Sequence, residues 1–512
     1  MFDAPQPMIP EILALHGKWR RTKAAIVSAS GETSWGAFAS AVNRVANGLR
    51  ALGIKPGDRV GIVMSNAVET VEATFGVLRA GAVAVPLNVS VSDAAAEAML
   101  ADAGVAAVIA TEDQAARLEP MLPRLGSLVT RGAIRAGGPA GPWQDFAAFK
   151  AQAEDVWTGA PPEASAPCNI IYSSGTTGMP KGIVHTHERR LAWAYDMAIA
   201  LRYHGGGRTL ATLGLYSNIS WAAMLCTFVA GGTLVLHKSF DAAAALRAIE
   251  TYRVTHTAMV PLQYQRLVEH ANFPRADKSS MQAMMSCGSP LPMALKEKLF
   301  ASFGCGVIEL YGLTEGLITT LDPEDAPGRM ASVGRPMQGT DIRIIDEDGR
   351  EAAAGEAGEI VGRGRITMPG YWNRPDATRE ATWTDEHGRA WLRTGDIGRL
   401  DGEGFLTIVD RKKDMILSGG QNIYPADIEA VLLSHEAVSE CAVIGVPHET
   451  WGETPLAIVV PRGRCEADAL KEWVNARIGK QQRVSAVAFR DALPRNANGK
   501  ILKRELRRDY AG

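Results

Sequence analysis

Hydrophobic and polar positions repeat along the first part of the chain in the order strand, helix, strand. A short apolar run at residues 59–64 is followed by a helical pattern at 68–80 and by a second apolar run at 81–86. The same succession returns further along, at residues 234–236, 241–252 and 257–260. Such a unit is the building block of a parallel sheet that is covered by helices. The pattern therefore predicts an α/β fold of layered subdomains up to about residue 340.

The pattern changes between residues 341 and 410, where short β-like runs are separated by Asp-Gly and Gly-rich turns. This texture predicts an antiparallel, barrel-like subdomain. After a charged cluster at residues 410–414 comes a mixed pattern, with a helix at 425–433 and strands at 440–445 and 455–460. We therefore expect a large N-terminal domain that ends at residue 410 and a small, mobile α+β C-terminal domain, residues 411–512.

Composition and charge narrow the classes of function. The chain has 512 residues, of which 46% are hydrophobic and 21% are charged, and its formal net charge is −2 at pH 7. A chain of this size buries a sizeable core, and this charge supplies no global basic field. We therefore expect no nucleic-acid partner, and we expect any bound anion to be held locally.

Cysteine usage and the lack of long apolar runs indicate a cytoplasmic protein. The six cysteines form neither a CxxC pair nor a dense disulfide pattern; they are Cys168, Cys226, Cys287, Cys305, Cys441 and Cys465. The first ten residues lack a basic start followed by an apolar run, and no uninterrupted apolar run reaches about 18 residues. We therefore expect reduced thiols and no membrane span.

The segment Ile170–Gly182 is the most informative one for chemistry. It runs from an apolar strand into a loop of hydroxyl side chains, glycines and one lysine: Ser173, Ser174, Gly175, Thr176, Thr177, Gly178 and Lys181. Glycines let backbone N–H groups approach phosphate oxygens, hydroxyls donate further bonds, and the lysine adds positive charge. The loop is not a Walker A motif, because Pro180 precedes the lysine and Gly182 follows it. Taken alone, the segment is also compatible with a Ser/Thr/Gly-rich surface turn.

This loop resembles the signature loop of the acyl-adenylate-forming superfamily, which includes acyl- and aryl-CoA synthetases, luciferases and peptide-synthetase adenylation domains. Four further stretches resemble family motifs in the same order: Tyr311-Gly-Leu-Thr-Glu315, Ser332-Val-Gly-Arg-Pro336, Leu392-Arg-Thr-Gly-Asp396 with Asp410-Arg411, and Pro494-Arg-Asn-Ala-Asn-Gly-Lys500. The resemblance covers essentially the whole chain. The chain is identified as a member of this superfamily, in the acyl-CoA synthetase branch.

The resemblance implies a role for individual residues around ATP and Mg²⁺. Glu315 would ligate Mg²⁺, Thr314 would contact the α-phosphate and Tyr311 would lie against adenine. Asp396 would bind the ribose hydroxyls, and Arg411 would reach the same nucleotide. Taken alone, Glu315 is more typical of a helix N-terminal carboxylate, and Asp396 of a solvated turn residue. The resemblance further implies that Gly288 and Ser289 contribute to the nucleotide site.

The resemblance also implies a two-step reaction. Lys500, together with Lys181, Thr176 and Glu315, would act while the carboxylate attacks the α-phosphorus. The C-terminal domain would then rotate about Lys413, and a loop with Gly419 and Gly420 would meet the thiol of coenzyme A. On its own, Lys500 is a solvated charge near a turn, and the two glycines fit a flexible hairpin.

The acid pocket is expected around Tyr216, Ser217, Trp221, Met259 and Gly312. Ser217 stands where many CoA ligases carry histidine and where amino-acid-activating domains carry aspartate, so neither phenylpropanoid nor amino acids are indicated. No arginine is evident for a second carboxylate, which favours an apolar monocarboxylic acid, fatty or aryl. Large apolar residues of this kind are more often plain core.

Other functions remain open at this point. The acceptor could be a carrier-protein thiol, as in acyl-AMP ligases, or the chain could be a luciferase-type oxygenase. A non-catalytic adenylate-binding protein would be expected to lose Lys500, Glu315 or Lys181, and all three are present. A homodimer is a guess that the sequence does not decide.

Overall fold

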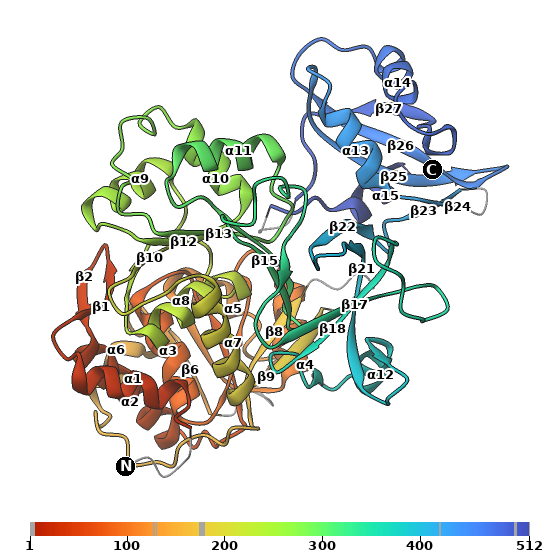
Figure 1. Ribbon diagram of the computed structural model, residues 1–512. Helices are drawn as coiled ribbons and strands as arrows, with labels where there is room; N and C mark the ends of the chain where they lie inside the picture. The colour runs from red at the N-terminus through yellow and green to blue at the C-terminus, as the bar shows by residue number, and fades with distance from the viewer. Residues whose placement is uncertain are drawn as a thin grey trace. The chain divides into compact units, whose positions relative to one another are not determined.

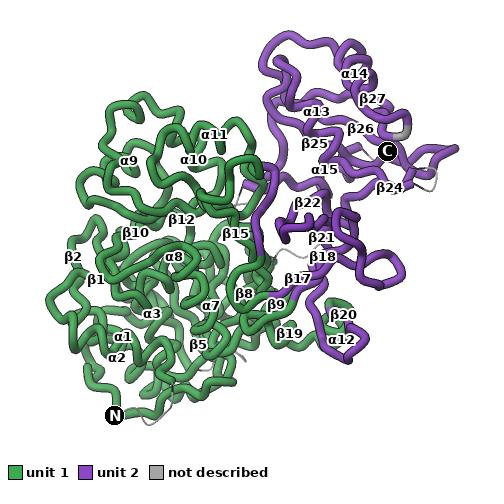
Figure 2. The backbone as a smooth tube through the Cα atoms, viewed as in Figure 1, with its two compact units in different colours: residues 1–330, 336–340, 363–381 green, residues 331–335, 341–362, 382–512 purple. Residues whose placement is uncertain are grey.

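The computed structural model describes residues 6–125, 129, 131–173, 180–418, 421–495 and 499–510. Contacts divide the chain into two compact units (Figure 2). The first comprises residues 1–330, 336–340 and 363–381, and the second comprises residues 331–335, 341–362 and 382–512.

The first unit contains a nine-stranded sheet that is parallel at its centre. Its strands are β1 (Ala24–Ser28), β2 (Gly31–Ser34), β10 (Arg208–Ala211), β11 (Thr233–Leu236), β12 (His256–Met259), β13 (Ala283–Ser286), β14 (Ile308–Leu313), β15 (Leu317–Leu321) and β16 (Arg335–Pro336). The order is β16-β15-β14-β13-β12-β10-β11-β1-β2. The β14–β15 and β1–β2 pairs run antiparallel, whereas β1, β10, β11, β12, β13 and β14 pair in parallel.

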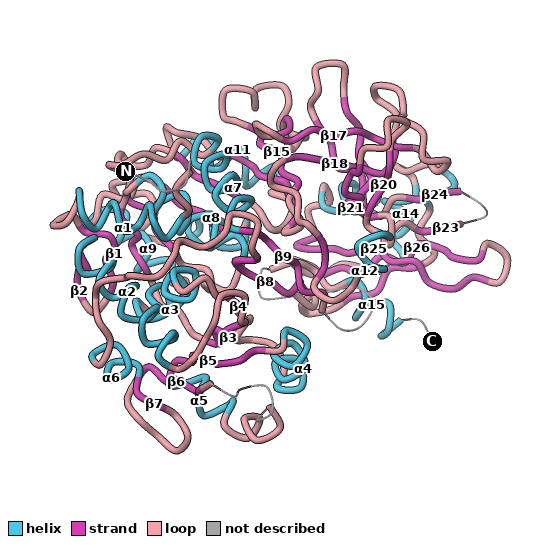
Figure 3. The backbone as a smooth tube through the Cα atoms, turned by 90° about the horizontal axis from the view of Figure 1, so that it is seen from below, coloured by secondary structure: helices cyan, strands magenta, loops and turns pink. Residues whose placement is uncertain are grey.

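An eight-stranded sheet forms the second framework of this unit. Its strands are β3 (Arg59–Val63), β4 (Val83–Pro86), β5 (Val105–Thr111), β6 (Gly132–Ala136), β7 (Gln144–Asp145), β8 (Pro167–Ser173), β9 (Lys181–Thr186) and β19 (Gly370–Tyr371). The order is β19-β9-β8-β4-β3-β5-β6-β7. In Figure 3 β3, β4 and β5 lie side by side, as their parallel pairing requires. β9 runs antiparallel to both β8 and β19.

Helices separate and cover these sheets. Those of the first unit are α1 (Ile9–Trp19), α2 (Trp35–Ala51), α3 (Val68–Arg79), α4 (Asp93–Ala103), α5 (Glu112–Leu118), α6 (Phe146–Ala151), α7 (His187–Ala200), α8 (Asn218–Ala230), α9 (Ala242–Thr251), α10 (Pro261–Glu269), α11 (Met293–Ser302) and α12 (Pro375–Glu380). One buried cluster joins α2, α3, α7 and α8 to residues of both sheets, such as Ala211 and Val60. Leu210 of β10 points to the opposite face of its sheet, into a cluster with α9–α11. Val63 of β3 likewise points into a cluster with α4 and α5. Figure 1 shows α9, α10 and α11 grouped beside β10, β12 and β13.

The second unit holds two smaller sheets. The first consists of β17 (Thr340–Ile345), β18 (Gly358–Gly364), β20 (Thr382–Thr384), β21 (Ala390–Leu400) and β22 (Leu406–Arg411), in the order β17-β18-β21-β20 with β22 also on β21. The second consists of β23 (Ile416–Ser418), β24 (Gln421–Ile423), β25 (Val438–His448), β26 (Gly452–Pro461) and β27 (Ala486–Phe489), in the order β24-β23-β26-β25 with β27 on β26.

Helices cover both faces of the β25–β26 pair. These helices are α13 (Pro425–Leu433), α14 (Ala467–Asn475) and α15 (Lys503–Tyr510), and a 3₁₀ turn spans Lys480–Gln482. Val443 and Val459 pack with residues of α13 and α14, whereas Ile444 and Ile458 pack with Leu506 of α15. This alternation along two paired strands gives the small α+β body that the sequence predicts.

The α/β class and its layers are therefore confirmed, and several element boundaries agree closely. The predicted helix at 68–80 is α3 (Val68–Arg79), and the predicted helix at 425–433 is α13. In the second strand–helix–strand succession, β11 and β12 are not neighbours, because β10 lies between them. All six cysteines are free, and four of them are buried. Within the part of the chain that the structure describes, no helix is both long and apolar enough to cross a membrane.

The packing of α2 on α3 yields a test of the first unit. A Cβ added to Gly76 of α3 would lie 2.3 Å from Val45 Cγ1 of α2. Helix propensity alone favours Ala over Gly by about 1 kcal/mol. Because of the overlap, we expect Gly76→Ala instead to lower the free energy of unfolding by about 1–3 kcal/mol in denaturant titrations.

The matched control for this test removes the obstructing methyl groups. In a Val45→Ala background the same Gly76→Ala change should cost less than in the wild type, because the contact with Cγ1 is removed and only the contact with the Cβ of residue 45 remains. A more stable Gly76→Ala single variant would contradict the close packing.

Candidate active site

The turn that joins β14 to β15 places Glu315 at its tip. The two strands pair antiparallel up to Leu313 and Leu317, and the Gly316 N–H donates to the Leu313 carbonyl over 3.1 Å. Gly316 has φ +104°, and a Cβ there would lie 2.1 Å from the Ile366 carbonyl oxygen. The turn therefore needs glycine at this position for its backbone conformation and for the close approach of residue 366.

Three further hydrogen bonds hold this turn from outside. His185 of β9 contacts the Thr314 carbonyl oxygen through Nε2 at 2.7 Å, and the Met368 N–H donates to the Glu315 carbonyl at 2.7 Å. The Tyr371 hydroxyl donates to Glu315 Oε1 at 2.9 Å. Burial holds the pKa of His185 well below its ordinary value, so the imidazole is neutral and its Nε2 proton faces the carbonyl.

Tyr371 also connects the turn to Lys181. Lys181 begins β9 opposite Ser173 of β8, and its Nζ lies 5.0 Å from the centre of the Tyr371 ring. Tyr371 pairs with Ile183 in the β9–β19 ladder, which fixes its backbone beside the lysine. Burial raises the pKa of Tyr371, and the charge of Glu315 adds to this rise, so the hydroxyl stays protonated and remains a donor. Lys181, Tyr371 and Glu315 thus form one connected group.

The other predicted nucleotide residues of the first unit are placed along neighbouring strands. Ser286 of β13 lies opposite Glu309 of β14 in a parallel pair, so the segments that follow these residues start side by side. Gly288 and Ser289 belong to the first segment, and Tyr311, Gly312 and Thr314 to the second. Five predicted phosphate-loop residues lie outside the described residues: Ser174, Gly175, Thr176, Thr177 and Gly178.

The predicted acid-pocket residues divide between two buried clusters. Trp221 is completely buried between the two sheets, and its Nε1 donates to the Leu215 carbonyl at 3.0 Å. Ser217 caps α8 by accepting from the Ile219 N–H at 3.3 Å, and Tyr216 beside it is half-buried. Met259 packs instead with α9, α10 and α11 on the other face of the nine-stranded sheet. The structure therefore does not bring Met259 together with Trp221.

In the second unit, two of the sequence motifs meet beside the predicted hinge. Asp396 of β21 pairs with Arg411 of β22, and Arg411 Nε lies 3.4 Å from Asp396 Oδ1. Lys413 stands in the turn after β22, where the Asp414 N–H donates to the Arg411 carbonyl at 2.9 Å. Lys500 is close enough to these residues to interact electrostatically with both Asp396 and Arg411. Gly419 and Gly420 lie outside the described residues.

The electrostatics around Lys500 are unusual for a lysine. Burial lowers its pKa to about 7, and the charges of Arg411 and Lys413 act in the same direction. The charges of Asp396 and Asp414 oppose this shift but do not cancel it. A lysine in such surroundings gains its proton readily when an anion arrives, which suits a group that must meet phosphate and carboxylate oxygens.

A magnesium ion would find only part of its ligand shell in the protein. Among the described residues no three His, Cys, Asp or Glu side chains gather in a way that could hold a metal. Mg²⁺ commonly takes one or two carboxylates and completes its octahedron with phosphate oxygens and water. The Glu315 carboxylate, oriented by Tyr371, fits this kind of shared site.

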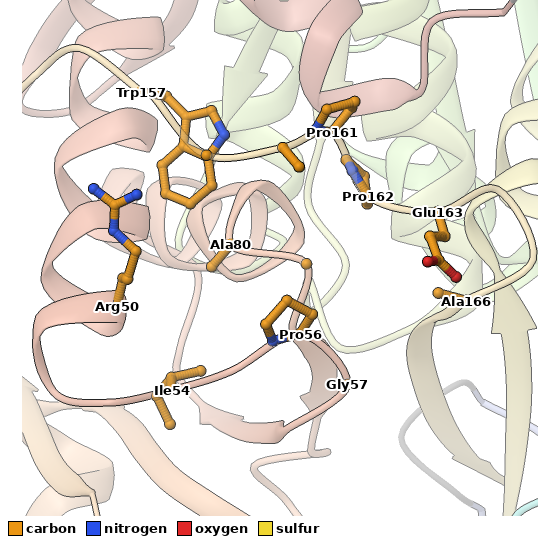
Figure 4. Close-up of a pocket in the computed structure, with 13 residues that line it drawn as sticks. Arg50, Ile54, Pro56, Gly57, Ala80, Trp157, Pro161, Pro162, Glu163 and Ala166 are labelled. Atoms are coloured by element: carbon orange, nitrogen blue, oxygen red, sulfur yellow. The ribbon is translucent and has the colours of Figure 1, made fainter. Parts of the chain in front are cut away.

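The cavity in Figure 4 lies elsewhere in the first unit. It has a volume of about 430 Å³ and is lined by Arg50, Pro56, Gly81, Trp157 and Pro161, among others. Gly81 and Pro56 precede β4 and β3, so the cavity is at the amino ends of these parallel strands. Ligand sites of open α/β sheets form at the carboxyl ends, and this cavity is therefore separate from the candidate active site.

Two residues that contact the turn of Glu315, Tyr371 and His185, could not be predicted from the sequence. Tyr371 is 56 residues from Glu315, and His185 is 129 residues from Thr314. Side chains of β9 alternate between two faces, so His185 lies on the same face as Lys181, four residues earlier. This shared face is the one local signal for His185. Neither partner can be found from spacing alone.

Comparison with known proteins agrees with this geometry. The model of the AMP-binding enzyme family matches residues 16–372, and that of the AMP-binding enzyme C-terminal domain matches residues 427–500. The chain is 36% identical over 476 residues to a feruloyl-CoA synthase of Amycolatopsis sp, covering 92% of each chain. It is 37% identical over 481 residues to the long-chain-fatty-acid–CoA ligase FadD13 of Mycobacterium tuberculosis, covering 92% and 91%. ATP-bound MatB from Rhodopseudomonas palustris has a similar structure, with a TM-score of 0.89, 27% identity, and 98% and 99% coverage.

The chain therefore belongs to the AMP-binding enzyme family. Within the acyl-adenylate-forming superfamily it lies in the acyl-CoA synthetase branch, where its curated relatives are named as CoA ligases. This confirms the family that the five motifs indicate.

The Tyr371–Glu315 bond leads to a prediction about magnesium. Tyr371→Phe keeps the ring beside Lys181 but removes the hydroxyl that orients Glu315. Loss of such an outer partner typically costs about 10–100-fold in metal affinity. We expect the Mg²⁺ concentration for half-maximal pyrophosphate release to rise about tenfold. Tyr195→Phe, on the exposed surface of α7, is the control, and an unchanged Mg²⁺ dependence in Tyr371→Phe would contradict the proposed role of Glu315.

The environment of Lys500 leads to a prediction about pH. The neutral amine is the reactive form, so acylation of Lys500 in the free protein should reach half its maximal rate near pH 7. Arg411→Gln removes a positive neighbour, which makes protonation easier and should move this midpoint to higher pH. Mass spectrometry of the labelled peptide measures both, and a midpoint above about 10 would show an ordinary solvated lysine.

Proposed function

We propose that this protein is an ATP- and Mg²⁺-dependent acyl-CoA synthetase. A carboxylate and ATP would give acyl-AMP and pyrophosphate, and coenzyme A would then give acyl-CoA and AMP. The observation that carries the proposal is the pair of cationic groups that the fold fixes beside acidic partners. Lys181 lies over the ring of Tyr371, whose hydroxyl binds Glu315, and Lys500 interacts electrostatically with Asp396. Family membership supports the same chemistry.

The first half-reaction is mostly a problem of charge. Carboxylate and triphosphate repel each other, and the attacking oxygen must stay in line with the α-phosphorus. Lys181 and the N–H groups of the phosphate loop would neutralise phosphate oxygens, and Glu315 would hold Mg²⁺, which supplies further neutralisation when bound. Lys500 would pair with the carboxylate and the α-phosphate. No covalent intermediate with the protein is required.

The second half-reaction would not need Lys500. The thiol attacks the adenylate carbonyl, the bond from that carbon to the AMP oxygen breaks, and AMP leaves with both electrons. We propose that residues 411–512 turn about Lys413 between the steps, so that Gly419 and Gly420 replace Lys500. The turn at Lys413 is short and is preceded by Arg411, whose side chain pairs with Asp396. β22 and β23 belong to different sheets, which supports a hinge in the turn between them.

The proposed acid is an apolar monocarboxylate. Ser217, which uses its side chain to cap α8, supplies no charge for an ammonium group. Trp221, which is completely buried, makes the packing behind this segment apolar. The relatives are named for aryl as well as long-chain acids, so their names do not decide between the two.

A cytoplasmic location and a homodimeric state remain predictions from sequence. Sedimentation equilibrium would test the second, with one species of twice the chain mass of 54.7 kDa expected.

The decisive test of the proposed function is AMP formation from ATP over a panel of short, medium, long and aromatic acids, with and without coenzyme A. We expect AMP to depend on both one acid class and coenzyme A. Lys500→Ala should lower acid-dependent AMP formation by about 10²-fold or more, because it removes charge stabilisation in the transition state. The same variant should still convert synthetic acyl-AMP and coenzyme A to acyl-CoA at close to the wild-type rate.

Lys480→Ala, on an exposed 3₁₀ turn of the same unit, is the matched control and should leave both steps unchanged. AMP that forms with acid but is not accelerated by coenzyme A would make a carrier-protein thiol the acceptor. No AMP with any acid would contradict the proposal.

A further inference from the structure

Asn66 lies where the carboxyl ends of both sheets of the first unit approach each other. It follows β3 of the eight-stranded sheet, and its side chain contacts the segments that follow β10 and β11 of the nine-stranded sheet. Only 8% of Asn66 is exposed. Ligands of open α/β sheets bind outside the carboxyl ends of the strands, so this residue is at the functional edge.

The amide of Asn66 uses both of its donor hydrogens and its acceptor. Nδ2 donates to the Leu213 carbonyl at 2.9 Å and to the His237 carbonyl at 3.0 Å. Oδ1 accepts from the Leu215 N–H at 2.8 Å. Two carbonyls face the amide nitrogen and one N–H faces its oxygen, so the partners define the orientation of the amide. Asn66 thus holds the backbone of residues 213–215 through hydrogen bonds to the Leu213 carbonyl and from the Leu215 N–H.

Residues 213–215 directly precede the predicted acid-pocket residues Tyr216 and Ser217. Trp221 Nε1 donates to the Leu215 carbonyl, and the Ser217 N–H donates to the Gly214 carbonyl at 2.9 Å. The ring of Tyr216 lies so close over Gly214 that a Cβ there would be 2.2 Å from Tyr216 Cε1. A change in the backbone of residues 213–215 therefore moves the Tyr216 ring and the start of α8.

The neighbouring Ser65 does not share this role. Its hydroxyl donates to Asp113 Oδ2 at 2.6 Å, and its N–H donates to Thr111 Oγ1 at 3.0 Å. Thr111 ends β5 of the same eight-stranded sheet, and Asp113 lies in the first turn of α5, which follows directly. The side chain of Asn66 therefore bonds to segments of the nine-stranded sheet, whereas Ser65 bonds to residues at the end of β5 and the start of α5. Ser65 is thus a matched control for Asn66.

We propose that Asn66 is a positioning residue that fixes residues 213–217 and, through them, the Tyr216 ring, and so sets which acids the enzyme accepts. This rests on the proposed function, because it takes residues 216–221 as a wall of the acid site. Asn66 touches neither ATP residues nor the Glu315 turn in any contact among the described residues. Its effect should therefore fall on the acid and not on the nucleotide.

The test compares Asn66→Leu, Asn66→Asp and Ser65→Ala in the full chain. Asn66→Asp keeps the shape but turns two donors into acceptors that face carbonyl oxygens, which should be at least as disruptive as Asn66→Leu. We expect KM for the preferred acid to rise about tenfold in both Asn66 variants, as the loss of one or two buried hydrogen bonds implies. KM for ATP should stay within about twofold, and the preference among acids of the panel should flatten.

A second variant and a second measurement guard against simple loss of folding. Gly214→Ala should displace Tyr216 directly and reproduce the selective change in acid preference. Hydrogen–deuterium exchange should be faster in the peptide that contains residues 213–217 for Asn66→Leu, and unchanged there for Ser65→Ala.

Two failures are distinguishable. Unchanged exchange in that peptide, or KM values for acid and ATP that rise together, would overturn the positioning role of Asn66. A wild-type enzyme that forms no adenylate with any acid would instead contradict the proposed function, and the acid-selecting role would fall with it.

Discussion

The turn at residues 314–316 carries the strongest constraint of the first unit, because its position determines where Glu315 can act. Four backbone and side-chain contacts hold it: the hairpin bond to Leu313, the bond from His185, the bond from Met368, and the hydroxyl of Tyr371. They come from the hairpin itself, from β9, and from the segment of residues 368–371. A carboxylate that is held in this way loses little freedom when a metal binds, which is the advantage of preorganisation.

Lys181 and Lys500 also depend on being held at fixed places. Reaction between a carboxylate and a triphosphate requires positive charge at fixed places, and an exposed lysine supplies it poorly because water competes. Lys181 is fixed by its place at the start of β9 and by the Tyr371 ring. Lys500 is buried, and burial together with the charges of Arg411 and Lys413 lowers its pKa to about 7, so its protonation responds to the charge of a group that binds beside it.

The sequence predicts the elements of this fold better than their connections. Helices such as α3 and α13 follow from periodicity, and the α/β layers follow from the alternation of apolar runs with helices. Motif order indicates Glu315, Lys181, Asp396 and Lys500, because each stands beside a glycine or in a short polar turn. Sheet order does not follow from pattern, and β10 separates β11 from β12 although the two are consecutive in sequence.

The residues that hold the site in place from distant segments of the chain could not be predicted from the sequence. His185, Tyr371 and Asn66 are single polar residues in ordinary surroundings, and their partners lie 129, 56 and up to 171 residues away. Tertiary contacts at such separations leave no periodic signal. The apolar residues raise the opposite difficulty, because Trp221 and Met259 have similar character in sequence and yet pack on opposite faces of one sheet.

The central claim is that an oxygen of the acid becomes an oxygen of AMP. Incubation of a ¹⁸O-labelled carboxylic acid with ATP, Mg²⁺ and coenzyme A tests this directly, with the label located by mass spectrometry of the phosphate products. The account predicts one ¹⁸O in AMP and none in pyrophosphate, because the carboxylate attacks the α-phosphorus and the thiol later breaks the carbon–oxygen bond. Label in inorganic phosphate with formation of ADP, or unlabelled AMP, would contradict it.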